Sequence, residues 1–228
     1  MHDDLRRAVL DANLDLEARG LAHASFGNVS AVDRDAGVVA IKPSGVAYAD
    51  LRAEDVSIVS LEDGAVLDGL RPSSDTPTHL ALYEALPSVG GIAHTHSTYA
   101  TSWAQARRPL PCLGTTHADY FNGDVPCTRA LRDDECGDGY ERATGDVIVE
   151  ALEGHDPLEL PAVLVASHGA FAWGISAAEA VEHAAALEEV AHLAFNAVAL
   201  APVEPVSAAL LDRHFGRKHG PTAYYGQR

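Results

Sequence analysis

Two histidines separated by one residue lie at the end of an apolar run, in the segment GGIAHTHSTYA from Gly90 to Ala100. Alternate side chains of an extended strand share a face, so His94 and His96 are expected on the same side, about 6.6 Å apart along the backbone. Two imidazoles at that spacing can bind one ion. The alternative is a strand end whose histidines are solvated or bonded to the backbone, and the spacing alone favours neither.

A second apolar run, AVLVASHG, delivers another histidine, His168, with Gly169 directly after it. We expect a buried strand here that ends at His168, with the glycine allowing close approach of backbone or ligand. If the two strands are neighbours, three neutral imidazoles meet and leave a fourth position open, as in catalytic zinc sites. Other histidines compete for this role, including His79, His117 and His214.

Three polar loops rich in Gly or Ser accompany these histidines: FGNVS from Phe26, KPSG from Lys42 and RPSSD from Arg71. Backbone N–H groups and serine hydroxyls can bind a phosphate without a large positive patch, and Lys42 offers one local cation. Each loop taken singly also fits an ordinary turn or helix cap, for example before Pro77. Together, beside a His-x-His strand, they favour a phosphosugar site.

Composition indicates one acidic globular domain. The chain has 228 residues, of which 47% are hydrophobic and 21% charged, with a formal net charge of −17. We expect a single domain over 1–228, because no Gly-, Ser- or Pro-rich linker divides the chain. The negative charge argues against a nucleic-acid or anionic-membrane surface, since both need clustered Lys and Arg, and Lys42 and Lys218 are the only lysines.

Cysteine usage and the N-terminal segment bear on location. The three cysteines are odd in number and form no C-x-x-C pair, so reduced thiols are the simplest interpretation. The N-terminal segment has an acidic amphipathic pattern without the apolar core of a signal peptide, and no run is long enough for a membrane span. We therefore expect a cytoplasmic protein with no membrane partner.

Hydrophobic periodicity interleaves helices with short strands. Helices are expected from Leu5 to Leu16, from Pro77 onward, in ATSWAQA, and from a capping box of Ser176 and Glu179 into a long helical pattern. Strands are expected in GVVAIK, VSIVSL, GGIAHTH and AVLVASHG, while TGDVIVEAL fits helix or strand. The pattern predicts a layered α/β fold with a mixed sheet.

Long motifs in a fixed order give the chain a family resemblance. It resembles the sugar-phosphate epimerases of the class II aldolase family from about Leu5 to Gln227. The motifs that carry the resemblance are KPSG, RPSSDTPTHLALY, GGIAHTHSTYATSWAQA, GTTHADYF, VPCTR, SHGAFAWG, LEEVA and RKHGPTAYYGQ. The segment LRDDECGDGYERATG departs from the family pattern, and nothing catalytic is expected there.

The resemblance implies roles for individual residues. It implies a divalent metal, usually zinc with manganese or cobalt as alternatives, bound by His94, His96, His168 and Asp75. It implies that Asp119 and Tyr225 are the catalytic acid/base pair. The substrate-binding residues that it implies are Gly27, Asn28, Lys42, Ser44, Gly45, Ser73 and Ser74, with Thr115 and His214 helping to form the pocket.

The resemblance also implies a fold, an assembly and a reaction. The expected fold is a three-layer α/β/α sandwich around a largely antiparallel sheet, assembled as a C4 homotetramer with sites between subunits. The expected reaction interconverts L-ribulose 5-phosphate and D-xylulose 5-phosphate by breaking and re-forming the C3–C4 bond. The pathway, arabinose or ascorbate breakdown, stays open.

Two alternatives to an epimerase remain. One is a phosphosugar aldolase of the fuculose or rhamnulose type. Asp75 favours the epimerase, because such aldolases typically carry Glu at this place. The other is a non-enzymatic scaffolding domain like the adducin head, against which the retained His and Asp set argues.

Overall fold

The computed structural model describes residues 2–219 and 223–224. Its centre is a seven-stranded sheet in the order β4-β3-β2-β1-β5-β7-β6, and each pair of neighbouring strands is antiparallel. An isolated bridge from Cys127 to Leu164 adds a parallel contact. The expectation of a largely antiparallel sheet is confirmed. The strands are β1 (Asn28–Asp33), β2 (Val38–Ile41), β3 (Ser57–Ser60), β4 (Val66–Asp68), β5 (Gly91–Thr95), β6 (Ala162–Val165) and β7 (Gly169–Gly174).

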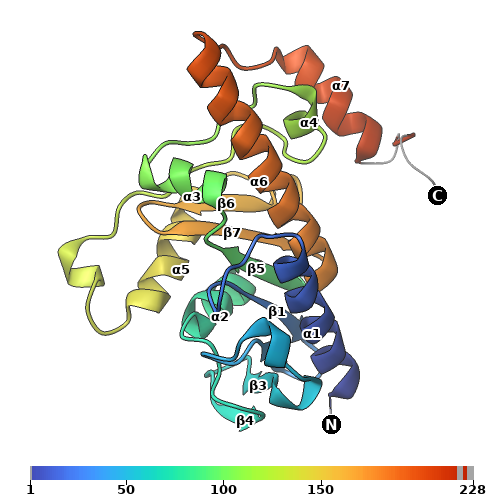
Figure 1. Cartoon of the computed structure of the whole chain (residues 1–228), viewed down its shortest axis with the longest axis vertical. Helices are drawn as coiled ribbons and strands as arrows, with labels where there is room; N and C mark the ends of the chain where they lie inside the picture. The colour runs from blue at the N-terminus through green and yellow to red at the C-terminus, as the bar shows by residue number, and fades with distance from the viewer. Residues whose placement is uncertain (1, 220–222, 225–228) are drawn as a thin grey trace.

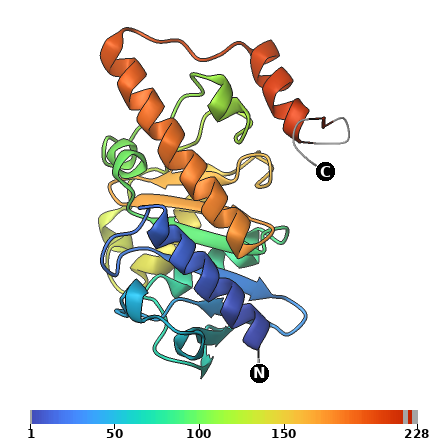
Figure 2. The ribbon, with the colours of Figure 1, turned by 45° about the vertical axis from the view of Figure 1, so that its right-hand side comes forward.

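Helices cover both faces of this sheet, as Figures 1 and 2 show. On one face α1 and α6 lie side by side, with α3 beside α6, and on the other face α2 packs against α5. The predicted three-layer α/β/α sandwich is therefore confirmed. The helices are α1 (Asp3–Ala18), α2 (Thr76–Ala85), α3 (Thr98–Gln105), α4 (Thr115–Ala118), α5 (Tyr140–Ala151), α6 (Ala177–Leu200) and α7 (Ala208–Lys218), with short 3-10 turns at Tyr48–Asp50, Ala53–Asp55 and Asp133–Glu135.

Strand alternation divides the core into two clusters. Ala93 and Ala172 face the cluster formed with α1, α3 and α6. Their strand neighbours Ile92, Phe171 and Trp173 face the cluster formed with α2 and α5. Successive side chains of a strand point to opposite faces, so both faces of β5 and β7 are buried. The sheet thus places polar side chains of β1 and β5 inside the molecule.

The long helix α6 begins as its capping box predicts. The Ser176 hydroxyl accepts the Glu179 N–H at 3.2 Å, and the Glu179 carboxylate accepts the Ile175 N–H at 2.6 Å. This first turn lies directly against β5, because a Cβ on Gly91 would be 2.3 Å from the Ala177 nitrogen. The glycine is therefore required by close packing.

One segment differs from the sequence-based prediction, and another, which the sequence left open between helix and strand, is a helix. The run AVLVASHG was expected to remain extended to His168, but β6 ends at Val165 and a turn follows. Ser167 takes a left-handed φ of 64°, which reverses the chain into β7 and places His168 in the turn. TGDVIVEAL, which fitted either helix or strand, lies in α5. Within the described residues, no helix is both long and apolar enough to cross a membrane.

Replacement of Gly91 by alanine tests the contact between β5 and α6. Because the added methyl would collide with backbone, which cannot move aside locally, we expect Gly91→Ala to lower the free energy of unfolding by about 1–3 kcal/mol or more. Urea unfolding followed by tryptophan fluorescence measures the change. Gly137→Ala is the control, since no atom lies within 4 Å of a Cβ there. An unchanged midpoint for Gly91→Ala would contradict this packing.

Candidate metal and substrate site

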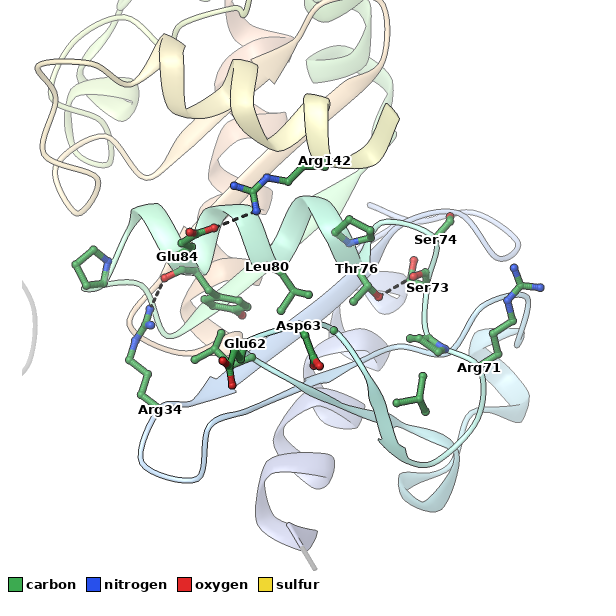
Figure 3. Close-up of a pocket in the computed structure, with 17 residues that line it drawn as sticks. Arg34, Glu62, Asp63, Arg71, Ser73, Ser74, Thr76, Leu80, Glu84 and Arg142 are labelled. Atoms are coloured by element: carbon green, nitrogen blue, oxygen red, sulfur yellow. Dashed lines mark hydrogen bonds and ion pairs between the residues drawn. The ribbon is translucent and has the colours of Figure 1, made fainter. Parts of the chain in front are cut away.

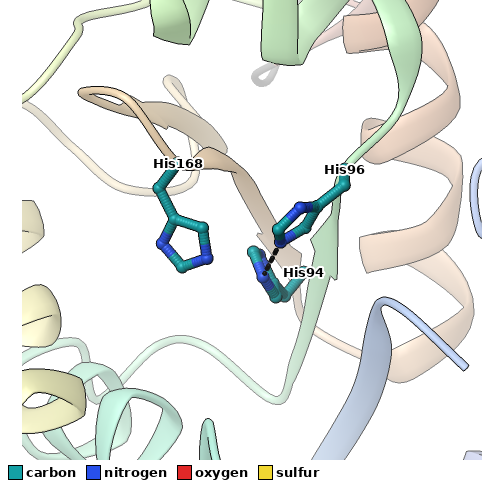
Figure 4. A group of neighbouring side chains, drawn as sticks. All are labelled: His94, His96 and His168. Carbon is teal, nitrogen blue, oxygen red and sulfur yellow. Dashed lines mark hydrogen bonds between the residues drawn. The ribbon is translucent and has the colours of Figure 1, made fainter.

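Three histidines from two separate chain segments point toward one another (Figure 4). His94 lies on β5, His96 lies just beyond its end, and His168 lies in the turn between β6 and β7. The Nε2 atoms of His94 and His96 are 3.0 Å apart, and the ring centroids of the three histidines are 4.8 to 5.0 Å apart. One nitrogen of each ring lies within 4.8 Å of the others. The predicted trio therefore forms one cluster.

The hydrogen bond on the far side of His94 fixes which nitrogen is free to bind an ion. Its Nδ1 is 3.0 Å from the Ala170 carbonyl oxygen, which can only accept, so Nδ1 carries the hydrogen and Nε2 presents its lone pair to the cluster. Nitrogens bound tetrahedrally to zinc at about 2.0–2.1 Å lie roughly 3.3 Å apart, close to the spacing of the His94 and His96 nitrogens. The donor set fits a divalent metal.

Burial keeps these imidazoles in the form that binds metal. It lowers the pKa of His94 to about 3, and it also lowers the pKa values of His96 and His168. Neutral imidazole is the metal ligand, because a protonated ring has no lone pair to donate. At neutral pH the cluster therefore needs no proton release from these side chains before an ion binds.

Asp75 lies in the same cavity without belonging to the tight histidine cluster. It occupies the N-cap position of α2, yet its side chain makes no capping bond and instead accepts the Asn28 Nδ2–H at 2.7 Å. Burial opposes ionisation of Asp75, but His94, His79 and the Asn28 bond outweigh it and lower its pKa. The carboxylate is therefore charged beside the histidines.

The histidine cavity encloses about 370 Å³ and brings together the predicted metal ligands and the three polar loops. The loops are bonded to one another, because Ser44 N–H donates to the Arg71 carbonyl at 2.9 Å and Ser73 N–H donates to the Lys42 carbonyl at 3.1 Å. The residues that line the cavity are Ser25, Phe26, Gly27, Asn28, Lys42, Pro43, Ser44, Gly45, Ser73, Ser74, Asp75, His94, His96 and His168.

Lys42 has an unexpected part in this cavity. Its side chain is only 2% exposed, and its Nζ donates to the Val46 carbonyl at 2.7 Å and lies 4.8 Å from the centre of the Tyr48 ring. Burial lowers the pKa of Lys42. The ammonium group thus holds its own loop in place, and the donors at the loop surface are N–H groups and hydroxyls.

The remaining predicted site residues form a separate cluster. Asp119 follows α4 and accepts hydrogen bonds from Arg217 at 2.6 and 3.0 Å and from His214 Nδ1 at 3.0 Å. Burial opposes its ionisation, but these bonds lower its pKa. Thr115, Asp119 and His214 do not line the histidine cavity and lie with α4 and α7 at one end of the molecule (Figure 1). Tyr225 lies outside the described residues.

Sequence reasoning missed Tyr140, which lies in the segment where nothing catalytic was expected. Its ring centroid is 6.2 Å from that of His168, and its pKa is raised by burial and, to a smaller degree, by the Asp75 carboxylate. Tyr140 begins α5, whose start is fixed to α2 by a hydrogen bond of 2.5 Å from Thr78 Oγ1 to the Glu141 carbonyl. The approach of Tyr140 to His168 joins segments that are distant in the sequence, so no local pattern indicates it.

A larger cleft of about 880 Å³ lies on the other side of the loop from Arg71 to Asp75 and shares Ser73 and Ser74 with the histidine cavity (Figure 3). Its walls carry charges of both signs, including an Arg142–Glu84 ion pair with an N–O distance of 3.0 Å. Its lining holds no histidine or cysteine. The histidine cavity is therefore the better candidate for chemistry.

The chain is similar in sequence to known proteins over nearly its whole length. Residues 7–195 match the family described as Class II Aldolase and Adducin N-terminal domain. The L-ribulose-5-phosphate 4-epimerase UlaF of Salmonella paratyphi C is 53% identical over 225 residues, covering 98% of this chain and 99% of that protein. The protein of that name from Salmonella typhi is 54% identical over 226 residues, with the same coverage.

Solved structures agree in fold. An L-fuculose 1-phosphate aldolase superposes with a TM-score of 0.82 at 25% identity, covering 94% of this chain and 95% of that one. YgbL of Klebsiella pneumoniae, a putative aldolase/epimerase/decarboxylase, gives a TM-score of 0.74 at 30% identity, with coverages of 93% and 98%. This chain thus shares its architecture with a solved phosphosugar aldolase and with YgbL.

Replacement of His96 tests the cluster as a metal site. His96→Asn removes one of the three converging nitrogens, so we expect zinc affinity to fall by more than the roughly 10- to 100-fold that outer-shell changes cause. Competition with a chromophoric chelator measures the affinity. His155→Asn, at an exposed histidine outside the cavity, is the control. Equal zinc affinity in both variants would rule His96 out as a ligand.

Proposed function

The chain belongs to the class II aldolase and adducin N-terminal domain family, and from this premise we propose that it is an L-ribulose-5-phosphate 4-epimerase. It would interconvert L-ribulose 5-phosphate and D-xylulose 5-phosphate. The observation that carries the proposal is the convergence of three neutral imidazoles in a cavity lined by Ser- and Gly-rich loops. The names of the similar Salmonella proteins support the same substrate.

Bond cleavage suits this site better than direct removal of a proton from C4. A carbanion at C4 has no adjacent group to delocalise its charge, whereas breaking the C3–C4 bond yields the enediolate of dihydroxyacetone and glycolaldehyde phosphate. A divalent cation bound by His94, His96 and His168, with Asp75 beside it, would supply Lewis-acid stabilisation of negative charge. Zinc suits this nitrogen-rich donor set, and manganese or cobalt are alternatives.

The polar loops have the task of retaining the phosphorylated fragment. Re-forming the bond after the aldehyde has turned over inverts C4, so glycolaldehyde phosphate must stay bound while its carbonyl rotates. Ser44 and Gly45 in one loop and Ser73 and Ser74 in the other would hold the phosphate through N–H groups and hydroxyls. Lys42 would act by fixing the first loop through the Val46 carbonyl.

Proton transfer at the C4 oxygen is assigned to Asp119 and Tyr225. The bidentate ion pair with Arg217 keeps Asp119 ionised, and therefore able to accept a proton, at neutral pH. A base must come within about 2.6–3.2 Å of the proton that it removes, and Asp119 does not line the histidine cavity of its own chain. We therefore assign Asp119 and His214 to the site of a neighbouring subunit.

An assembly of several copies supplies that neighbour. The end of α6 exposes large apolar side chains, among them Phe195 at 51% and Leu200 at 86%, which a contact between subunits would cover. We assign a cytoplasmic homotetramer with active sites between subunits. The partners that we assign are small phosphosugars.

The competing function is a phosphosugar aldolase of the same fold. The solved L-fuculose 1-phosphate aldolase supports this alternative through its architecture. Asp75 favours the epimerase, because a carboxylate one methylene shorter than Glu is held by Asn28 on the metal side of the cavity. The two enzymes differ in whether the fragments escape.

A product assay separates the two functions. Incubation with L-ribulose 5-phosphate should give D-xylulose 5-phosphate with little free glycolaldehyde phosphate, because the loops retain that fragment. Removal of metal by a chelator should abolish turnover, and added zinc should restore it. Release of glycolaldehyde phosphate as the main product would favour the aldolase. Turnover that persists in metal-free protein would exclude a metal-dependent mechanism for either function.

Replacement of Asp119 tests its assignment as a base. Asn has nearly the same shape but cannot accept a proton, so Asp119→Asn should reduce kcat by about 100-fold or more. Zinc content should not change, because Asp119 lies outside the histidine cavity. Asp138→Asn, in an exposed loop, is the control. Turnover at the control's rate would remove Asp119 from the mechanism.

A further inference from the structure

A buried histidine outside the metal cluster has one nitrogen without a partner. His79 is 0% exposed, and its Nδ1 lies 2.7 Å from the Ser30 hydroxyl. Its Nε2 is also buried and has no hydrogen-bond partner among the described residues. Buried polar atoms are nearly always hydrogen-bonded, so this nitrogen calls for a partner that forms in the working protein.

The position of His79 relates it to the candidate metal site. Residues four apart on a helix share a face, which places Asp75, His79 and Tyr83 in one row on α2. The opposing row on β1 consists of Asn28 and Ser30. Asn28 donates to Asp75 at 2.7 Å, and the Ser30 hydroxyl lies 2.7 Å from His79 Nδ1 and 2.8 Å from the Tyr83 hydroxyl. The two rows thus join the metal cavity to the core.

The His79 ring faces the turn that contains Asp75. Helical side chains lean toward the N-terminus, so His79 covers the preceding turn. Its ring meets the edge of Phe171 at a centroid distance of 5.9 Å, and Phe171 stacks on His94 at 4.2 Å. The His79 ring therefore lies between the core and the metal cavity.

The Ser30 hydroxyl bonds to both the Tyr83 hydroxyl and His79 Nδ1, and two orders of donors satisfy these bonds. In the order Tyr83 to Ser30 to His79, Nδ1 accepts, and a neutral imidazole then has its hydrogen on Nε2. The reverse order would turn a lone pair toward the Asp75 carboxylate. The chain of donors therefore ends in an N–H that needs an acceptor.

We propose that His79 is a positioning residue for the metal site, and that its Nε2–H holds the Asp75 carboxylate directly or through one buried water. Asn28 Oδ1, which is buried and has no partner among the described atoms, would give such a water a further contact. The chain Tyr83–Ser30–His79–Asp75 then fixes the carboxylate from the side opposite the cavity. This inference rests on the metal site assigned above.

Two variants of His79 separate the roles of its nitrogens. The amide oxygen of Asn can take the place of the accepting Nδ1, and the amide nitrogen of Gln can take the place of the donating Nε2. We expect His79→Asn to weaken zinc binding by about 10- to 100-fold, the range for lost outer-shell partners of metal ligands. We expect His79→Gln to retain affinity within about threefold of wild type. Zinc affinity is measured by chelator competition, and stability by urea unfolding.

A second buried histidine provides the control. His183 on α6 bonds through Nδ1 to the Trp173 carbonyl at 2.6 Å and does not line the cavity. His183→Asn should leave zinc affinity unchanged even where it lowers stability. Wild-type affinity in both His79 variants would overturn the proposal, as would equal loss in both. Wild-type protein that does not bind zinc would instead refute the metal site itself.

A structure of the zinc-bound wild-type protein tests the same contact without a variant. Nε2 of His79 should lie within about 3.2 Å of an Asp75 carboxylate oxygen, or of a water that also contacts that oxygen. Nε2 surrounded only by carbon atoms would overturn the proposal. This measurement decides the matter where His79→Asn does not fold.

Discussion

The close approach of β5 and β7 at Gly169 is the constraint on which the site depends. A Cβ at Gly169 would lie 2.6 Å from the Thr95 carbonyl oxygen, 3.3 Å from the His96 ring and 3.5 Å from the His94 ring. Any side chain there would push the turn that holds His168 away from the other two histidines. The same pairing aligns the Ala170 carbonyl with His94 Nδ1, which sets the tautomer of that ring. Convergence and protonation state thus have one structural origin.

The acidic composition of the chain constrains how it can hold a phosphate. Its formal net charge is −17, and its one lysine near the cavity is buried and bonded to its own loop. Affinity for an anion must therefore come from oriented N–H groups, from hydroxyls and from a cation that the histidines bind. A ketose phosphate presents its carbonyl and its phosphate at opposite ends. Separate metal and loop regions in one cavity suit such a molecule.

Local patterns predicted part of the site, and pairing between distant segments decided the rest. The alternation of His94 and His96 and the Ser176 cap follow from local geometry, and both are confirmed. Neither β1 nor β7 was predicted as a strand, because β1 mixes polar with apolar residues and the apolar run of β7 is only four residues long between two glycines. The role of Asp75 came from family resemblance, since local composition favoured a helix cap. Tyr140 escaped notice because α5 approaches His168 only in the folded chain.

The division of the predicted site residues into two clusters follows from the path of the chain after α6. That helix extends past the sheet, and the chain then turns back so that α7 packs on α4 (Figure 2). Arg217 and His214 on α7 thereby reach Asp119 and hold its carboxylate by three hydrogen bonds. A carboxylate held so firmly cannot swing across its own subunit to reach the histidines. If Asp119 acts on the substrate, the histidine cavity of another copy must lie next to Asp119. The exposed apolar side chains at the end of α6 are suited to such a contact between copies. Catalysis would then require assembly, because a single folded chain would hold a metal and a phosphate but would lack the group that transfers the proton.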